Sequence, residues 1–258
     1  MILLSTGNQT IKIDAGELIG YTVDGHEYIH QKGSPGWRNS DTEMFPIIGP
    51  TEMADFKVKT PRGTAIQDQH GLLRELEYEL VQHSDHHAVF QKKYLANTPV
   101  KNSKFPDKSS VNELFWPYSF TFVKQFELQE NGLKITFKVS GETGMPFMLG
   151  YHPAFKLHTR KPIIEIDERN IDLAQVLEVG GRALQVENCE TLILKDAMRL
   201  KIKTQGFGNF MLWTEVPTMI CIEPITFYPY AVEQHNLNKG FMVLNEKEVN
   251  FVVRIMPF

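Results

Sequence analysis

Three short segments of the sequence set titratable side chains among apolar and turn residues. The segments are Asp68–Arg74 with His70, Gly150–Phe155 with His152, and Ile220–Pro224 with Glu223. An imidazole exchanges protons near neutral pH, and burial can bring the pKa of a carboxylate toward the same range. Two imidazoles and one carboxylate therefore indicate general acid–base catalysis, a chemistry that needs no metal or cofactor.

Glu223 is the most informative of the three because of its neighbours. Residues 219–222, Met-Ile-Cys-Ile, predict a buried strand, and Pro224 follows directly. A buried carboxylate is costly unless it is paired or neutralised. Glu223 is then either a proton acceptor in a site or a structural glutamate whose oxygens bind backbone donors.

The two histidines lie where the backbone is restricted or unusual. Pro153 pushes His152 into an extended conformation at the expected end of a strand. Gly71, after His70, can take conformations closed to other residues. The alternatives are a core histidine bonded to the backbone for His152, and a simple turn for the His-Gly pair.

The remaining histidine cluster does not predict a metal site. His83, His86 and His87 surround Ser84-Asp85, which is typical of a solvated hairpin loop, and no fourth ligand follows at a recognisable spacing. The sequence also lacks a glycine-rich phosphate loop, a zinc-protease helix motif and a nucleophile elbow.

The elements that must position these residues are strands. Alternation of apolar and polar residues predicts them, for example over 10–14, 133–139, 200–203 and 249–255. Asp24-Gly25 and Asn131-Gly132 predict hairpins. Helical patterns are confined to residues 109–115 and 170–176. We expect one mainly β domain over 1–258, with antiparallel strands in packed sheets or a barrel rather than a parallel α/β fold.

Composition excludes several classes of protein. The formal net charge is −4 with no basic stripe, which argues against nucleic-acid binding. Two cysteines, Cys189 and Cys221, are too few for a disulfide framework and predict reduced thiols. No signal peptide or membrane span is recognisable, so we expect a soluble, cytoplasmic protein without a membrane partner. Oligomeric state cannot be derived from these patterns.

Four segments, in order, resemble the aldose 1-epimerase family, especially its short bacterial branch. They are Phe45-Pro46-Ile47-Ile48-Gly49, His70-Gly71-Leu72-Leu73-Arg74, Gly150-Tyr151-His152-Pro153-Ala154-Phe155 and Cys221-Ile222-Glu223-Pro224. Each motif is short, but the ordered set spans most of the chain. The resemblance implies a galactose mutarotase-like fold, a large antiparallel β-sandwich (supersandwich) with few short helices.

The resemblance also implies an isomerase that interconverts the α and β anomers of an aldose or sugar phosphate. It assigns Glu223 as the base on the anomeric hydroxyl, His152 as the acid toward the ring oxygen, and His70 as a residue that holds and polarises the sugar. The expected partner is a small-molecule sugar or sugar phosphate, and no metal or cofactor is implied.

One position departs from the family pattern. Relatives commonly carry a sugar-binding arginine after the Phe-Pro-Ile-x-Gly segment, where this chain has Pro50. Arg38 or Arg74 are candidates to replace it, and with Lys32 they are also candidates to bind a phosphate. Trp37 and Tyr151 are further candidates for substrate binding. Trp37, Trp213, Phe227 and Tyr228 can stack on a sugar or simply pack in the core.

Two other functions compete with epimerase activity. The proline at position 50 motivates a non-catalytic carbohydrate-binding or sensing protein on the same scaffold. A lyase or hydrolase is the third alternative, since one fold hosts many chemistries. A hydrolase usually needs two carboxylates at the bond, and only Glu223 is a convincing one.

Overall fold

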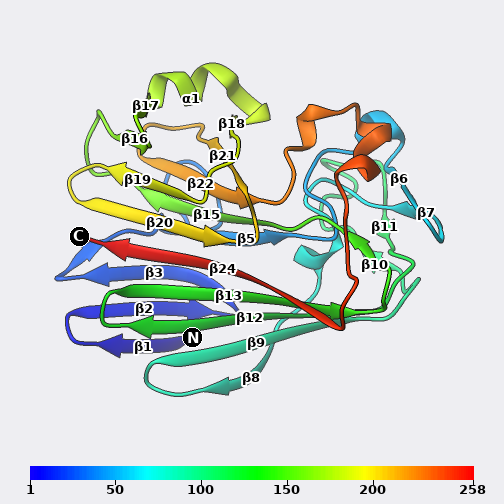
Figure 1. Ribbon diagram of the computed structural model, residues 1–258, viewed down its shortest axis with the longest axis horizontal. Coiled ribbons are helices and arrows are strands. Elements are labelled where there is room, and N and C mark those ends of the chain that lie inside the picture. The colour runs from blue at the N-terminus through cyan, green and yellow to red at the C-terminus, as the bar shows by residue number, and fades with distance from the viewer.

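The computed structural model describes residues 1–258 and is built mainly from antiparallel strands (Figure 1). Its largest sheet has nine strands, which are, from edge to edge, β17 (Arg169–Asp172), β16 (Ile163–Ile166), β19 (Thr191–Lys195), β20 (Arg199–Gln205), β24 (Glu248–Pro257), β13 (Gly132–Gly141), β12 (Phe120–Gln129), β9 (His87–Tyr94) and β8 (Glu79–His83). Burial alternates along every residue of β12, so this sheet has one face in the core and one toward solvent.

The second sheet has five strands and carries two of the three predicted site residues. Its order is β18 (Leu184–Val186), β21 (Asn209–Trp213), β22 (Met219–Ile225), β15 (Gly150–Lys156) and β5 (Asp41–Met44). All seven residues of β22 are buried, as are the first six of β15. Both faces of these central strands are therefore covered, which explains their continuous apolar sequence.

A four-stranded sheet and three strand pairs complete the β structure. The sheet contains β1 (Ile2–Thr6), β2 (Gln9–Asp14), β3 (Glu17–Val23) and β4 (His26–Glu27). The pairs are β6 (Lys57–Thr60) with β7 (Gly63–Ile66), β10 (Val100–Lys101) with β11 (Glu113–Leu114), and β14 (Pro146–Phe147) with β23 (Met242–Val243). The predicted hairpins at Asp24-Gly25 and Asn131-Gly132 are confirmed, because they join β3 to β4 and β12 to β13.

Helical structure is short. The α-helix α1 (Leu173–Val179) begins after Asp172, whose side chain accepts a hydrogen bond from the Gln175 amide, close to the predicted segment 170–176. Five 3₁₀ segments are η1 (Glu52–Ala54), η2 (Leu72–Glu75), η3 (Gly180–Arg182), η4 (Pro229–Ala231) and η5 (Gln234–Gly240). No helix combines the length and the apolar character needed to cross a bilayer.

The prediction of a helix over 109–115 is wrong, because the structure has no helix there. Glu113 and Leu114 form β11, which pairs with β10. Upstream, the Ser109 hydroxyl accepts a hydrogen bond from Asn102 Nδ2 at 3.1 Å. Serine side chains that bind local groups in this way compete with helical hydrogen bonding, and here the loop conformation is favoured.

The main core of 53 buried residues lies where the sheets face one another. One aromatic pair joins the five- and nine-stranded sheets: the ring centroids of Phe137 on β13 and Tyr151 on β15 are 4.9 Å apart. A buried ion network joins the same sheets: Lys124 Nζ on β12 lies 2.7 Å from Asp41 Oδ2 and 2.6 Å from Glu43 Oε1 on β5. Such burial of charge is tolerated only when the ions are paired. These ion pairs hold β5 in place beside β15 from the side of the nine-stranded sheet.

Candidate functional site

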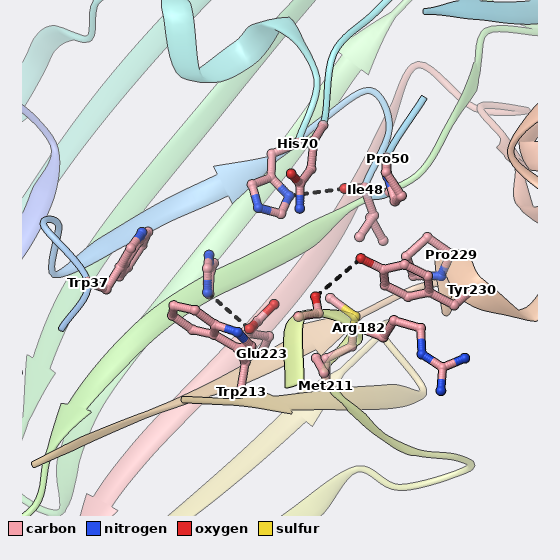
Figure 2. A pocket seen from close by; sticks show the side chains of 15 residues that line it. Trp37, Ile48, Pro50, His70, Arg182, Met211, Trp213, Glu223, Pro229 and Tyr230 are labelled. Carbon is pink, nitrogen blue, oxygen red and sulfur yellow. Dashed lines mark hydrogen bonds and ion pairs between the residues drawn. The ribbon is translucent and has the colours of Figure 1, made fainter. Parts of the chain in front are cut away.

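A pocket of about 270 Å³ opens on the face of the five-stranded sheet that points away from the main core (Figure 2). The strands β15 and β22 are antiparallel neighbours, with Gly150 facing Ile225 and Ala154 facing Cys221. This register sets His152 opposite Glu223. On the outer sides, His152 pairs with Thr42 of β5 and Glu223 with Met211 of β21. Directly opposed residues on a sheet point to the same face, so His152 and Glu223 belong to one row of side chains.

His152 and Glu223 are in direct contact at the bottom of this pocket. His152 Nε2 lies 3.0 Å from Glu223 Oε1, and the two residues are 5% and 2% exposed. Neither ring nitrogen of His152 forms a hydrogen bond of good geometry with the protein. Buried polar groups usually have such partners, so these nitrogens are placed to bind a ligand that enters the pocket.

Aromatic rings frame the imidazole of His152. The ring of Trp37 lies 4.2 Å from it, centroid to centroid, at an interplanar angle of 32°. The rings of His70 and Trp213 are 5.5 Å and 6.1 Å away. All of these residues line the pocket. Trp37 and Trp213 each pack against His152 and also line the pocket, so packing is observed for both, and stacking on a sugar stays a prediction.

His70 reaches the pocket from the loop before η2. Its φ is +74°, a left-handed conformation in which histidine is more frequent than most residues. Its Nδ1 lies 3.0 Å from the Ile48 carbonyl oxygen, and since a carbonyl only accepts, Nδ1 carries the proton. Desolvation first, then the electrostatic influence of His152 and Arg74, holds the pKa of His70 well below its ordinary value. The ring is therefore neutral, and Nε2 is an acceptor.

Gly71 explains why the His70 loop can approach the sheet. Its φ is +70°, and a Cβ on it would lie 2.2 Å from the Phe45 carbonyl oxygen. The Leu73 amide donates to that same carbonyl at 3.1 Å, and the Phe45 amide donates to the His70 carbonyl, also at 3.1 Å. Only glycine fits this close contact between the two segments.

Other predicted substrate-binding residues lie outside the pocket. Tyr151 is fully buried on the opposite face of β15 from His152, and its hydroxyl donates to Asp41 Oδ2 at 2.8 Å. This follows from the alternation of side chains along a strand. Arg38 and Arg74 line an adjoining groove rather than the pocket. Lys32 pairs with Glu17 at 2.8 Å on the surface.

Several pocket residues were not identified from the sequence. They include Gln69, Tyr230 and Arg182. Arg182 ends η3, and Figure 2 shows it at the opposite end of the pocket from Trp37, on the same side as Tyr230. The Tyr230 hydroxyl donates to the Gly181 carbonyl at 3.3 Å and links η4 to η3. The Gly180-Gly181 pair signals a turn in the sequence, but nothing there shows where the turn folds.

One group of side chains has the composition of a metal site. Donor atoms of His152, Cys221 and Glu223 all lie within 4.8 Å of one another. The thiolate is the form that binds metals, and burial raises the pKa of the Cys221 thiol well above its usual value. In the metal-free protein the thiol is therefore protonated. Both cysteines are free and buried.

Comparisons with known proteins identify the family and the fold. The profile of the aldose 1-epimerase family matches residues 52–201, which include His70 and His152. A galactose mutarotase-like protein from Lactobacillus casei has a TM-score of 0.81 at 17% identity, covering 100% of both chains. A galactose mutarotase related enzyme from Lactobacillus acidophilus has a TM-score of 0.77 at 16% identity, over 100% of this chain and 97% of that one. A galactose mutarotase-like protein from Clostridium acetobutylicum has a TM-score of 0.69 at 15% identity, over 99% and 94%. None of the curated proteins matches in sequence.

Proposed function

Because the chain belongs to the aldose 1-epimerase family, we propose that it is an isomerase that interconverts the α and β anomers of an aldose. The observation that carries the proposal is the contact of His152 with Glu223 at 3.0 Å in a pocket lined by His70 and two tryptophans. The galactose mutarotase-like fold is consistent with it, although fold alone does not define function.

Anomer exchange requires one proton to leave O1 and another to reach the ring oxygen O5. In our proposal Glu223 takes the O1 proton while the imidazolium of His152 protonates O5, and the C1–O5 bond breaks to give the open-chain aldehyde. Rotation about C1–C2 exposes the other face of the carbonyl, and the two groups reverse their roles on closure. Each such group typically contributes a rate factor of ~10²–10⁴.

The neighbouring residues support binding rather than proton transfer. The neutral imidazole of His70 can accept a hydrogen bond from a sugar hydroxyl at Nε2. It holds the sugar but does not polarise it through that nitrogen, which refines the role expected from the family. The exposed parts of Trp37 and Trp213 offer apolar surface to the C–H face of a pyranose.

The decisive experiment follows freshly dissolved α-glucose and α-galactose by polarimetry or NMR. We expect wild-type protein to accelerate equilibration, and Glu223→Gln to lower kcat by at least about 10²-fold without loss of the folded state. Glu187→Gln, an exposed glutamate outside the pocket, is the matched control and should behave as wild type. Turnover retained in Glu223→Gln would remove this carboxylate from the mechanism.

A sugar-binding protein without turnover is the second candidate, and Pro50 favours it. Pro50 lines the pocket and has no side-chain donor for a sugar hydroxyl. Calorimetry separates the two functions: saturable binding of an aldose together with no acceleration of anomer exchange would support binding alone. If the protein is an epimerase, Arg182, which also lines the pocket, supplies the guanidinium that Pro50 does not provide.

A further inference from the structure

Cys221 lies beside the contact of His152 with Glu223, on the same face of the five-stranded sheet. It is two residues before Glu223 on β22, and it pairs with Ala154, which is two residues after His152 on β15. Residues two apart on a strand point to the same face. The donor atoms of His152, Cys221 and Glu223 therefore lie within 4.8 Å of one another. The mechanism proposed above uses two of these side chains and leaves the thiol without a role.

All three side chains are buried and have few partners within the protein. His152, Cys221 and Glu223 are 5%, 0% and 2% exposed. Neither ring nitrogen of His152 forms a hydrogen bond of good geometry, and Glu223 forms no ion pair with a lysine or arginine. The other thiol, that of Cys189, donates to the Thr191 carbonyl at 3.1 Å, whereas the Cys221 thiol forms no hydrogen bond. Buried polar atoms usually have partners, so this group is suited to a ligand that engages all three donors.

The spacing of the three donors fits a tetrahedral zinc ion after small side-chain movements. Zinc binds sulfur at about 2.3 Å and nitrogen or oxygen at about 2.0–2.2 Å, which places tetrahedral ligands about 3.3–3.6 Å apart. His152 Nε2 and Glu223 Oε1 are 3.0 Å apart and have to separate by a few tenths of an ångström. The Cys221 sulfur has to approach them by about 1.2 Å at most.

The chemistry of the donors favours zinc over magnesium or calcium. Thiolate and imidazole are ligands of zinc and of softer metals, whereas magnesium and calcium prefer oxygen ligands alone. The Cys221 thiolate and the Glu223 carboxylate would together balance the two charges of the ion, as a buried site requires. The thiol is protonated in the metal-free protein, so binding releases its proton to the solvent.

The pocket gives the ion its route to the three ligands. His152 and Glu223 line the pocket, whereas Cys221 belongs to a small buried cluster against which Trp37 and Trp213 pack. An ion held by these three side chains would keep its fourth coordination position on the pocket side. Zinc sites with three protein ligands have an open position of this kind.

We propose that His152, Cys221 and Glu223 form a zinc site that blocks the acid–base pair when it is occupied. The ion takes the lone pairs of the imidazole and of the carboxylate that would otherwise accept the protons of the sugar. Zinc and an aldose therefore compete for the same place. The binding of zinc does not depend on the proposed function, whereas its inhibition of anomer exchange rests on it.

Cobalt(II), which replaces zinc in tetrahedral sites, gives a readout that does not depend on turnover. The protein is first freed of metal with a chelator and then titrated with Co²⁺ while the near-ultraviolet absorbance is followed. We expect a thiolate-to-cobalt charge-transfer band that saturates at one ion per chain and disappears when zinc is added. Cys221→Ala should lack the band, and Cys189→Ala, at the other free and buried cysteine, should retain it. A wild-type protein without the band would overturn the proposal.

Calorimetry with zinc measures the contribution of the thiol. Cys221→Ala should weaken zinc binding by at least about 10–100-fold, because the loss of groups outside the coordination sphere already costs that much. Cys221→Ser, which is closer in volume, replaces the alanine variant if circular dichroism shows that the latter is unfolded. Zinc binding that neither variant weakens would place the ion elsewhere, for example at the exposed His83 and His86, and would contradict the proposal.

Anomer-exchange assays test the inhibition. Zinc should slow the wild-type protein, and a chelator should restore the rate. Cys221→Ala should turn over at a rate near that of the wild type and need at least about 10–100-fold more zinc for the same inhibition. An active wild type that keeps its rate at full zinc occupancy would overturn the block. If no aldose is turned over but the cobalt band appears and depends on Cys221, the zinc site stands and the epimerase function fails.

Discussion

At the scale of single residues, His70 combines an unusual backbone with a fixed protonation state. The φ of +74° and the hydrogen bond to the Ile48 carbonyl orient the ring, and burial keeps it neutral. A neutral acceptor can hold a hydroxyl in the ground state and in the transition state alike. Interactions of this uniform kind affect KM more than kcat.

His70→Asn tests this role. Asparagine tolerates a positive φ, so the loop should keep its course. We expect KM for the accelerated sugar to rise about tenfold with kcat changed less than threefold, as for the loss of one hydrogen bond. Steady-state anomer-exchange kinetics measure both constants. A fall in kcat as large as that of Glu223→Gln would instead place His70 in proton transfer.

At the scale of elements, the site depends on the close contact between η2 and the end of β5. Gly71 is the contact point, and the backbone hydrogen bonds of Phe45 to His70 and Leu73 surround it. The same segment carries His70 into the pocket and Arg74 into the groove that adjoins it. A shift of η2 would therefore displace residues of both hollows together.

Gly71→Ala should be strongly destabilising, and Gly144→Ala is the matched control. Both glycines have positive φ, +70° and +85°, but a Cβ on Gly144 meets nothing within 4 Å. The control isolates the cost of the strained φ, while Gly71→Ala adds a collision with the Phe45 carbonyl. We expect Gly71→Ala to lose about 2 kcal/mol more free energy of unfolding in urea titrations. Equal losses would show that the contact relaxes at little cost.

The strands were predictable from the sequence because each carries its own signal. Alternation in 133–139 and 249–255 and the turn residues Asn131-Gly132 predict pairing partners locally. The position of Arg182 was not predictable, since the η3 segment reaches the pocket only through the packing of η4 and the five-stranded sheet. The predicted helix over 109–115 is absent for a different reason, because the hydrogen bond between Ser109 and Asn102 within one loop outweighs weak helical propensity.

At the scale of the whole molecule, buried charges join the two large sheets behind the site. Lys92 on β9 belongs to the same region as the Lys124 network: its Nζ donates to the Leu73 carbonyl at 2.9 Å. Desolvation lowers the pKa of Lys92 to about 8, with Lys124 adding to the effect and Glu43 opposing it. Sequence patterns gave no sign of this network, because Lys92 and Lys124 occupy inward positions of strands where alternation predicts apolar residues.

The pH dependence of the free energy of unfolding should reveal the lowered pKa of Lys92. The native amine loses its proton near pH 8, while the unfolded chain keeps it until near 10.5, so the unfolded state binds more protons between these values. The free energy of unfolding of the wild type should therefore rise relative to Lys92→Met as pH increases from 8 to 10. We expect a gain of about 2 kcal/mol in denaturant titrations. A constant difference across this range would mean that Lys92 titrates alike in both states.

The contact of His152 with Glu223 has one further consequence for the pocket. Without a ligand, the two groups lie in contact, but neither ring nitrogen of His152 forms a hydrogen bond of good geometry, so a ligand that enters the pocket has to supply partners for both groups. A molecule that offers only an apolar surface, or only one polar group, leaves His152 or Glu223 buried without a hydrogen-bond partner and should therefore bind weakly. A ligand with adjacent hydroxyl and ether oxygens, the arrangement at the reducing end of a cyclic sugar, would offer one partner to each group.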